Sequence, residues 1–388
     1  MTRQDFMAQN AGRYVELRRA LHQHPEIGLE EKRTSDIVAD CLSKMGYQVT
    51  RGLAGTGVVG TLKAGSGNKS IGLRADMDAL PMAEHSGKAW SSKVEGKFHG
   101  CGHDGHTATL LLAADYLAQT RNFNGTLNLI FQPGEELLYG GRLMLEDGLF
   151  SQFPCDAIFA MHNMPGLKKG SLHFRKGPMM ASSDTLEIEI TGKGGHGAIP
   201  ERTIDAGLVA CHVVVALQSI VSRNVTPFEP AVVTVGSIQS GVAPNIINAN
   251  AKLLLSVRTL NPQVRTMVLE NITRIACAQA ESFGASAKIN HLNGSPVLVN
   301  SPEMTDFALS VARELVDESM ICPHTPPMMS SEDFAFMLEA NPNGTYFFVG
   351  AGDEPGRCMV HNPGYDFNDD IIVPAATYWS ALAESWLK

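Results

Sequence analysis

The sequence contains no long hydrophobic run. Although 44% of its 388 residues are hydrophobic, no stretch approaches the roughly 18 uninterrupted apolar residues that a membrane helix needs. The opening residues, MTRQDFMAQNAGRYVELRRALHQHPE, have no apolar core of the kind found in secretory signal peptides. We therefore expect a cytoplasmic protein without a membrane partner.

Paired cysteines and basic clusters are also missing. The seven cysteines, an odd number, lie between Cys41 and Cys358 without the spacing of a disulfide framework. The formal net charge is -9, and lysines and arginines do not gather in any segment. This composition is not typical of a protein that binds nucleic acid. A small molecule is therefore the expected partner.

Short apolar segments alternate with helical patterns in the first part of the chain. Strands are expected at 58–62 (VVGTL), 70–76 (SIGLRAD), 126–131 (TLNLIF) and 156–162 (DAIFAMH), and helices at 106–119 and 140–148. This alternation predicts an α/β domain with a mostly parallel sheet and helices on both faces. Side chains that follow such strands gather at one edge of the sheet, where α/β domains bind their ligands.

The pattern changes near residue 183. Strands and helices then follow the order β-α-β-β-α-β of the ferredoxin-like fold, with helices over 202–222 and 262–283. The α/β pattern resumes later, with helices over 301–318, 331–340 and 374–387 and a strand over 345–352. We therefore predict one α/β domain made of residues 1–182 and 295–388, and an inserted lid or dimerisation domain over 183–294.

Residues 99–106 read HGCGHDGH, a dense group of possible metal donors. Three glycines let the backbone turn sharply and approach an ion, since they carry no Cβ. We therefore expect a loop that presents Cys101 and His103. A Cys-x-His pair alone points only weakly to a metal, because isolated cysteines are usually core residues and surface histidines usually have no special role.

Further donors lie at or after predicted strand ends. Glu135 and Glu136 are adjacent after a buried strand, where two carboxylates repel each other unless cations neutralise them; a solvated acidic turn is the alternative. His162 ends another strand, and His361 follows in MVHNPGYDFND. One thiolate, three imidazoles and a carboxylate suit one or two divalent transition ions. Because these donors are scattered along the chain, they are more typical of a catalytic site than of a structural one.

Seven segments of the chain resemble, in order, the motifs of one enzyme family. They are LHQHPEIGLEE (21–31), LRADMDALP (73–81), HGCGHDGH (99–106), FQPGEE (131–136), MHNMPG (161–166), GKGGHGAIP (192–200) and SSEDFAF (330–336). Over essentially its full length the chain is similar to the dinuclear metallo-amidohydrolases of the hippurate hydrolase, aminoacylase and auxin-conjugate hydrolase group, which are related to the glutamate carboxypeptidases. The wider family has His-x-Asp where this chain has Asp76-Met77-Asp78. The hippurate hydrolase branch shares this difference and takes its ligands from the Cys-Gly-His loop.

The resemblance implies a role for each candidate at the metal centre. Two divalent ions per subunit, zinc or manganese with nickel or cobalt as alternatives, are held by Cys101, His103, Glu136, His162 and His361. Glu135 is left as the general base, and Asp78 orients a ligand histidine.

The resemblance also implies contacts with the substrate from the inserted domain. His196, on a glycine-framed loop, contacts the substrate or its oxyanion, and many relatives donate this histidine from the partner subunit of a dimer. A flexible hairpin with an incidental histidine is the alternative. Asn245 and Arg258 lie where relatives hold the free carboxylate of the substrate. Relatives carry an acid two residues before this arginine, where the chain has Ser256. We expect a homodimer, or a higher oligomer, through the inserted domain.

The function implied is hydrolysis of the amide bond of N-acyl amino acids, such as hippurate or N-acetyl amino acids, by a metal-activated water. Neighbours in an extended segment point to opposite sides, so one carboxylate can ligate while Glu135 takes a proton from the water. A dipeptidase or carboxypeptidase of the same family is the nearest alternative. Two others remain: a binding protein with an inert structural metal, and an enzyme that uses Cys101 as a nucleophile or redox thiol, aided by His103.

Overall fold

The computed structural model describes residues 2–354 and 357–388. The chain divides into two compact units. The first comprises Met1–Gly177, Val299–Pro326 and Phe336–Lys388, and the second comprises Pro178–Leu298 and Pro327–Ala335. The division expected from the sequence keeps all of 295–388 in the first domain, whereas the structure assigns Pro327–Ala335 to the second unit.

A single large sheet forms the centre of the first unit, with the strand order β1-β2-β4-β3-β5-β16-β6-β15. Its strands are β1 (Gln48–Leu53), β2 (Gly57–Ala64), β3 (Ser70–Asp76), β4 (Gly125–Gln132), β5 (Ala157–Pro165), β6 (Leu172–His173), β15 (Ile321–Cys322) and β16 (Gly344–Gly352). The central strands β4, β3, β5 and β16 run parallel, while β1 with β2, β2 with β4 and β6 with β16 are antiparallel. Strands β3, β5 and β16 are buried along their whole length, as expected where helices cover both faces. The predicted α/β fold with a mostly parallel sheet is confirmed.

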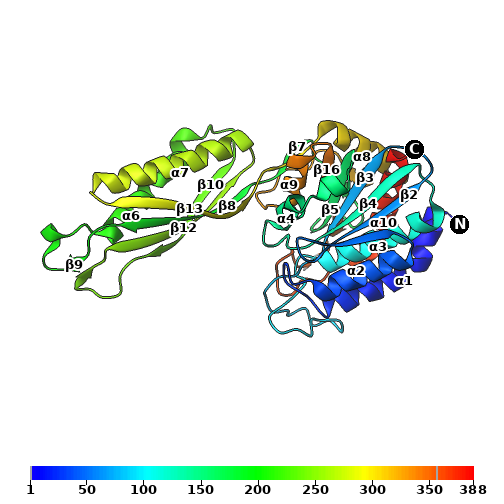
Figure 1. Ribbon diagram of the computed structural model, residues 1–388, viewed down its shortest axis with the longest axis horizontal. Coiled ribbons are helices and arrows are strands. Elements are labelled where there is room, and N and C mark those ends of the chain that lie inside the picture. The colour runs from blue at the N-terminus through cyan, green and yellow to red at the C-terminus, as the bar shows by residue number, and fades with distance from the viewer. Residues whose placement is uncertain (1, 355–356) are drawn as a thin grey trace. The chain divides into compact units, whose positions relative to one another are not determined.

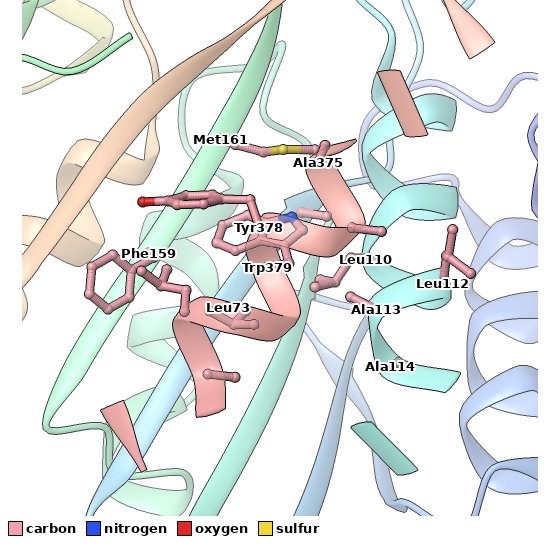
Figure 2. Packing of buried hydrophobic residues seen from close by; sticks show 14 of the residues in the cluster. Leu73, Leu110, Leu112, Ala113, Ala114, Phe159, Met161, Ala375, Tyr378 and Trp379 are labelled. Atoms are coloured by element: carbon pink, nitrogen blue, oxygen red, sulfur yellow. The ribbon is translucent and has the colours of Figure 1, made fainter. Parts of the chain in front are cut away.

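Helices lie on both faces of this sheet (Figure 1). They are α1 (Arg3–His22), α2 (Lys32–Lys44), α3 (His103–Thr120), α4 (Gly140–Glu146), α5 (Leu149–Gln152), α8 (Pro302–Leu315) and α10 (Ile372–Trp386), with 3-10 turns η3 (Glu318–Met320) and η4 (Asp369–Ile371). Helix α9 (Phe334–Ala340) starts in the second unit and ends in the first. Figure 2 shows α3 and α10 packed together over the strands, with Leu110 and Trp379 close to Leu73. All three side chains are fully buried, so this layer is the core that supports the site.

Helix α3 begins earlier than the sequence pattern indicates. The pattern predicts a helix from His106, after a loop that presents Cys101 and His103, but the helix already starts at His103. Gly102 has φ 95°, which is the left-handed region that favours glycine, and so ends the loop. Gly105 lies inside the helix because a Cβ there would be 2.3 Å from ring carbons of Phe367. A contact with a residue remote in sequence, rather than a turn, therefore explains this glycine.

The second unit has the predicted ferredoxin-like order. Its main sheet has the order β10-β12-β8-β13 and contains β8 (Ser183–Thr191), β10 (Ala231–Gln239), β12 (Asn250–Thr259) and β13 (Ser286–Ser295). Helices α6 (Ala206–Ser219) and α7 (Pro262–Ser282) pack on it through a separate apolar core that includes Ile188, Val213 and Ile272. The smaller elements are β9 (Gly195–His196), β11 (Ile246–Ile247), η1 (Pro200–Arg202), the π-helical η2 (Ile220–Asn224), and β7 (Gly177–Met180) and β14 (Leu298–Asn300) at the unit boundaries.

One helical stretch of the second unit is unusually apolar. Among the described residues, only Ala206–Asn224 has the length and composition that crossing a membrane requires. It packs Val209, Val213 and Leu217 into the core of the second unit, as the core helix of a globular domain does. Its outer face nevertheless exposes Leu208 and Val215.

Candidate metal centre

The proposed donors come from loops and elements that meet beyond the carboxyl ends of the parallel strands. Asp78 follows β3, and Glu135 and Glu136 follow β4. His162 lies near the end of β5, and His361 lies in the loop between β16 and η4. Parallel strands bring their carboxyl ends to one edge of a sheet, so residues distant in sequence lie close together there.

Backbone hydrogen bonds hold the donor-bearing loops to one another. The N–H of His361 donates to the carbonyl oxygen of Gly100 at 2.7 Å, next to Cys101. His361 itself has φ 64°, a conformation uncommon outside glycine. The N–H of Glu136 donates to Asp78 Oδ2 at 2.9 Å. The loops after β3, β4 and β16 are therefore fixed relative to the start of α3.

The proposed ligands fall into overlapping groups of donor atoms. Within each group these atoms lie within 4.8 Å of one another, and the groups are Cys101–His103–His162, Cys101–Glu136–His361 and His103–Glu135–Glu136. Cys101 Sγ lies 3.2 Å from His162 Nε2, and His361 Nε2 lies 3.4 Å from Glu136 Oε1. All five donors named from the sequence belong to these groups, together with Glu135. Groups that share members in this way suit two neighbouring ions rather than one.

The environment of His103 fits a bound cation. Its Nε2 is buried and has no hydrogen-bond partner among the described residues. This nitrogen lies 3.9 Å from Glu136 Oε1, 4.0 Å from Glu135 Oε2 and 3.8 Å from Asp76 Oδ2. These distances are too long for hydrogen bonds but suit donors arranged around one ion. Because thiolate, imidazole and carboxylate are ligands of zinc and related metals, these residues fit a dinuclear centre.

The protein groups set the protonation of the donors. Burial, with the charges of Glu136 and Glu135, raises the pKa of the Cys101 thiol well above its usual value. Burial keeps the pKa of His162 well below its usual value, so its ring is neutral. Burial opposes the charge of His103 also, but Asp76 and Asp78 outweigh it and raise its pKa to about 10. Since a metal binds thiolate and neutral imidazole, metal binding at this centre releases protons.

Asp78 contacts two of the proposed ligands. Its Oδ1 lies 3.2 Å from His103 Nδ1, and its Oδ2 accepts the N–H of Glu136. The side chain is almost completely buried. Such a contact selects the nitrogen of a histidine that is free to ligate, which is the role that the resemblance implies for Asp78.

Sequence reasoning missed a second buried network beside the centre. His106 Nδ1 lies 2.6 Å from Asp76 Oδ1, and His106 Nε2 lies 2.6 Å from Asn163 Oδ1. Asn163 in turn donates to the hydroxyl of Tyr365 at 2.7 Å. The His106 ring centroid is 4.6 Å from that of His162, so the network borders a ligand. The spacing of the two histidines could have indicated this network. His106 follows His103 by about one turn of helix, so in a helix that includes both residues they lie on the same face.

The remaining candidates lie in the second unit. His196 pairs with Ile246 across β9 and β11, and the N–H of Gly197 donates to the carbonyl oxygen of Asn245 at 2.8 Å. His196 and Asn245 are therefore neighbours at an exposed two-stranded sheet whose strands are distant in sequence. Arg258 lies on β12, a strand of the main sheet, and is half-buried. The structure thus gathers the metal donors in one unit and the proposed substrate contacts in the other.

The chain is similar to known proteins over nearly its whole length. Residues 72–385 match the model of peptidase family M20/M25/M40. The chain is 45% identical to the hippurate hydrolase of Campylobacter jejuni over 97% of each chain. It is 34% identical to thermostable carboxypeptidase 1 of Saccharolobus solfataricus, over 95% of this chain and 94% of that one. The crystal structure of Bacillus subtilis YXEP, a dinuclear metal binding peptidase, matches with a TM-score of 0.84 and 32% identity, over 98% of this chain and 99% of that one.

Proposed function

Since the chain belongs to peptidase family M20/M25/M40, we propose that it hydrolyses the amide bond of N-acyl amino acids of the hippurate or N-acetyl type. The observation that carries this proposal is the set of overlapping donor groups with Glu135 beside a ligand. A hippurate hydrolase is 45% identical to the chain and a carboxypeptidase 34%. The closer similarity favours an acyl amino acid over a peptide as the substrate.

Each residue of the centre has a proposed task. Two divalent ions, zinc or manganese, or else nickel or cobalt, are held by Cys101, His103, Glu136, His162 and His361. When bound, such ions lower the pKa of a water from roughly 15.7 to about 7 and polarise the carbonyl that is attacked. Glu135 is buried beside this donor set. Its carboxylate takes the proton of the attacking water and passes it to the departing amine. Asp78 keeps His103 in the orientation that ligation needs.

The proposed contacts with the free carboxylate of the substrate come from the second unit. Arg258 Nη1 donates to Ser331 Oγ at 3.0 Å and to the carbonyl oxygen of Met329 at 3.4 Å. Burial lowers the pKa of Arg258. Because both hydrogen-bond partners are neutral, this half-buried guanidinium is suited to pair with a carboxylate. Asn245 and His196 supply polar groups, the imidazole serving the oxyanion.

We also propose that the protein is a homodimer joined through the second unit. The outer surface of α6 and β10 exposes large apolar side chains, of which Leu208 is 50% exposed, Val215 72%, Val232 40% and Ile238 52%. Large exposed apolar patches commonly mark protein–protein interfaces, and we assign these side chains to such an interface. His196 then acts in its own subunit or in that of its partner. A sedimentation run that finds only monomer at full activity would exclude action from the partner.

A cytoplasmic location is the last part of the proposal. The seven cysteines are all free thiols. Reducing compartments keep thiols in this state, whereas secreted proteins commonly pair them. Fractionation of the source cells tests this location.

The decisive experiment combines metal analysis with one substitution. Glu135→Gln is expected to retain both ions but to lower the turnover of benzoylglycine by about 100-fold to 10,000-fold, because the amide takes no proton from water. Glu146→Gln serves as the matched control, since this glutamate of α4 is 60% exposed. Unchanged turnover in Glu135→Gln would remove Glu135 as the base.

The same preparation separates the alternatives. Dialysis against EDTA is expected to abolish activity, whereas an enzyme that used Cys101 as its nucleophile would remain active. Faster turnover of dipeptides than of N-acyl amino acids would favour a dipeptidase. No turnover of either class with both ions bound would favour an inert metal site.

A further inference from the structure

The segment Glu26–Glu31, part of the motif LHQHPEIGLEE, has no role in the chemistry described so far. In the first unit it packs against the loops that follow β3 and β4. The N–H of Ala79 donates to the carbonyl oxygen of Glu26 at 2.8 Å. A Cβ added at Gly28 would lie 2.7 Å from Leu137 Cδ1 and 3.0 Å from Gly134 Cα. The segment therefore lies in close contact with the backbone beside Glu135.

Glu31 places a fully buried carboxylate in this contact. Its Oε1 accepts the N–H of Gly134 at 2.9 Å, and its Oε2 accepts the hydroxyl of Thr56 at 2.6 Å. Burial, with the charge of Asp78, raises the pKa of Glu31 to about 7. Burying a carboxylate is costly, so its position calls for a structural or functional reason.

Capping of α2 does not supply that reason. Glu31 is the N-cap residue of this helix, but its side chain makes no capping hydrogen bond. The Glu26 carboxylate accepts the N–H groups of Arg33 and Thr34 instead, at 3.0 and 2.8 Å. The carboxylate of Glu31 is thus directed at Gly134 and Thr56, away from its own helix.

Two buried carboxylates bracket the proposed base. The Glu31 carboxylate accepts the N–H of Gly134, the residue before Glu135, and the Asp78 carboxylate accepts the N–H of Glu136, the residue after it. Both hydrogen bonds are 2.9 Å long. Gly134 has φ 65°, so the chain turns sharply at this point. Because the backbone is anchored on both sides, the side chain of Glu135 starts from a fixed position.

We propose that Glu31 is a positioning residue that fixes the peptide carrying Glu135 by accepting the N–H of Gly134. The proposal rests on the function proposed above, in which Glu135 is the base. The rate of proton transfer from water to a carboxylate depends on where that carboxylate lies, since a misplacement of about 1 Å can lower a rate by about 100-fold. Loss of this contact is therefore expected to lower kcat without weakening substrate binding.

Two substitutions separate the hydrogen bond from the charge. Glu31→Asp keeps the charge but is one methylene too short to bridge Thr56 and Gly134. Glu31→Gln loses the charge but keeps the length and an acceptor oxygen. Glu30→Gln is the control, because this neighbour is 60% exposed and pairs only with Lys97 in the contacts described.

With both ions bound and benzoylglycine as the substrate, Glu31→Asp is expected to lower kcat by about 10-fold to 100-fold, with KM within about twofold of the wild type. Glu31→Gln and Glu30→Gln are expected to stay within about threefold of the wild-type kcat. A wild-type kcat for Glu31→Asp would overturn the proposal. So would a Glu31→Gln variant as slow as Glu31→Asp, or a fall in kcat that follows a loss of metal.

A second readout does not depend on activity. Amide hydrogen exchange at Gly134, measured by NMR on metal-loaded protein with labelled glycine, is expected to be slow in the wild type and in Glu31→Gln, and about 10-fold faster or more in Glu31→Asp. Equal exchange in all of them would refute the contact. If the wild type hydrolyses no N-acyl amino acid, the proposed function fails while this measurement still decides the role of Glu31. If Glu31→Asp does not fold, the Glu31→Gln variant decides the matter. Rapid exchange of the Gly134 amide in this variant would overturn the proposal, whereas slow exchange with a kcat near that of the wild type would support it.

Discussion

Replacing Arg18 by methionine tests a buried ion network next to the metal centre. The Arg18 side chain is 0% exposed, and its Nη1 lies 3.4 Å from Asp104 Oδ2 and 3.1 Å from Asp366 Oδ1. Its Nε lies 2.8 Å from Asp369 Oδ1. Asp104 directly follows the proposed ligand His103, so this network joins α1 to the first turn of α3. Methionine keeps much of the length of arginine and removes the charge.

The structure indicates the magnitude of the effect. Breaking a buried ion pair by removing one partner costs about 3–5 kcal/mol, because an uncompensated charge remains. After Arg18 is replaced, Asp104 still has His22 as a partner, with Nδ1 at 2.8 Å from its Oδ2, and Asp369 still has Arg19, with Nη2 at 2.8 Å from its Oδ2. These remaining partners limit the penalty. We therefore expect the free energy of unfolding of the first unit to fall by about 3 kcal/mol, the lower end of that range.

Chemical unfolding followed by tryptophan fluorescence measures this change. The three tryptophans of the chain all lie in the first unit: Trp90, Trp379 and Trp386. Arg19→Met is the matched control, because the Arg19 side chain is 38% exposed and its ion pair, with its cation–π contact to Trp90, contributes only about 1 kcal/mol. A loss below about 1 kcal/mol for Arg18→Met, or equal losses for both variants, would refute the reasoning.

Three further predictions concern stability and the centre. Although burial opposes its charge, Asp104 raises the pKa of His22 to about 9. The stability that this histidine contributes is therefore expected to be complete below about pH 6.5 and to be lost as the pH rises through about 9. Unfolding curves of the wild type and His22→Gln across this pH range check the prediction. Gly105→Ala is expected to lower the unfolding free energy by about 1–3 kcal/mol, since its Cβ would meet an aromatic ring at 2.3 Å. Gly12→Ala, where an added Cβ meets nothing within 4 Å, is expected to raise the unfolding free energy by up to about 1 kcal/mol. Asp78→Ala is expected to weaken metal binding or activity by about 10-fold to 100-fold; a metal titration with the wild-type affinity would contradict that role.

Much of the fold follows from local patterns in the sequence. The helix expected over 262–283 is α7, Pro262–Ser282, and it begins where the side chain of Asn261 accepts two backbone N–H groups. The strand expected over 345–352 is β16, Gly344–Gly352, whose continuous burial matches its apolar sequence. These elements could be predicted because the periodicity of apolar residues and the capping residues lie within one segment.

Features that depend on distant residues could not be predicted in this way. The start of α3 was misplaced because the glycines of HGCGHDGH suggest a loop, whereas Gly105 makes room for Phe367, far away in the chain. The network of His106 and Asp76 was missed, although both residues lie in quoted motifs. No local pattern states that the two side chains meet.

By itself, the sequence determined the order of strands and helices, the ferredoxin-like insertion and the kinds of donor that end near the strands, because these features are local. Only the tertiary structure decided which donors share a group within 4.8 Å and which buried carboxylates hold the backbone around Glu135. Coordination and hydrogen bonding depend on distances between side chains from different loops, and these distances are set only when the strands align and the loops pack against one another.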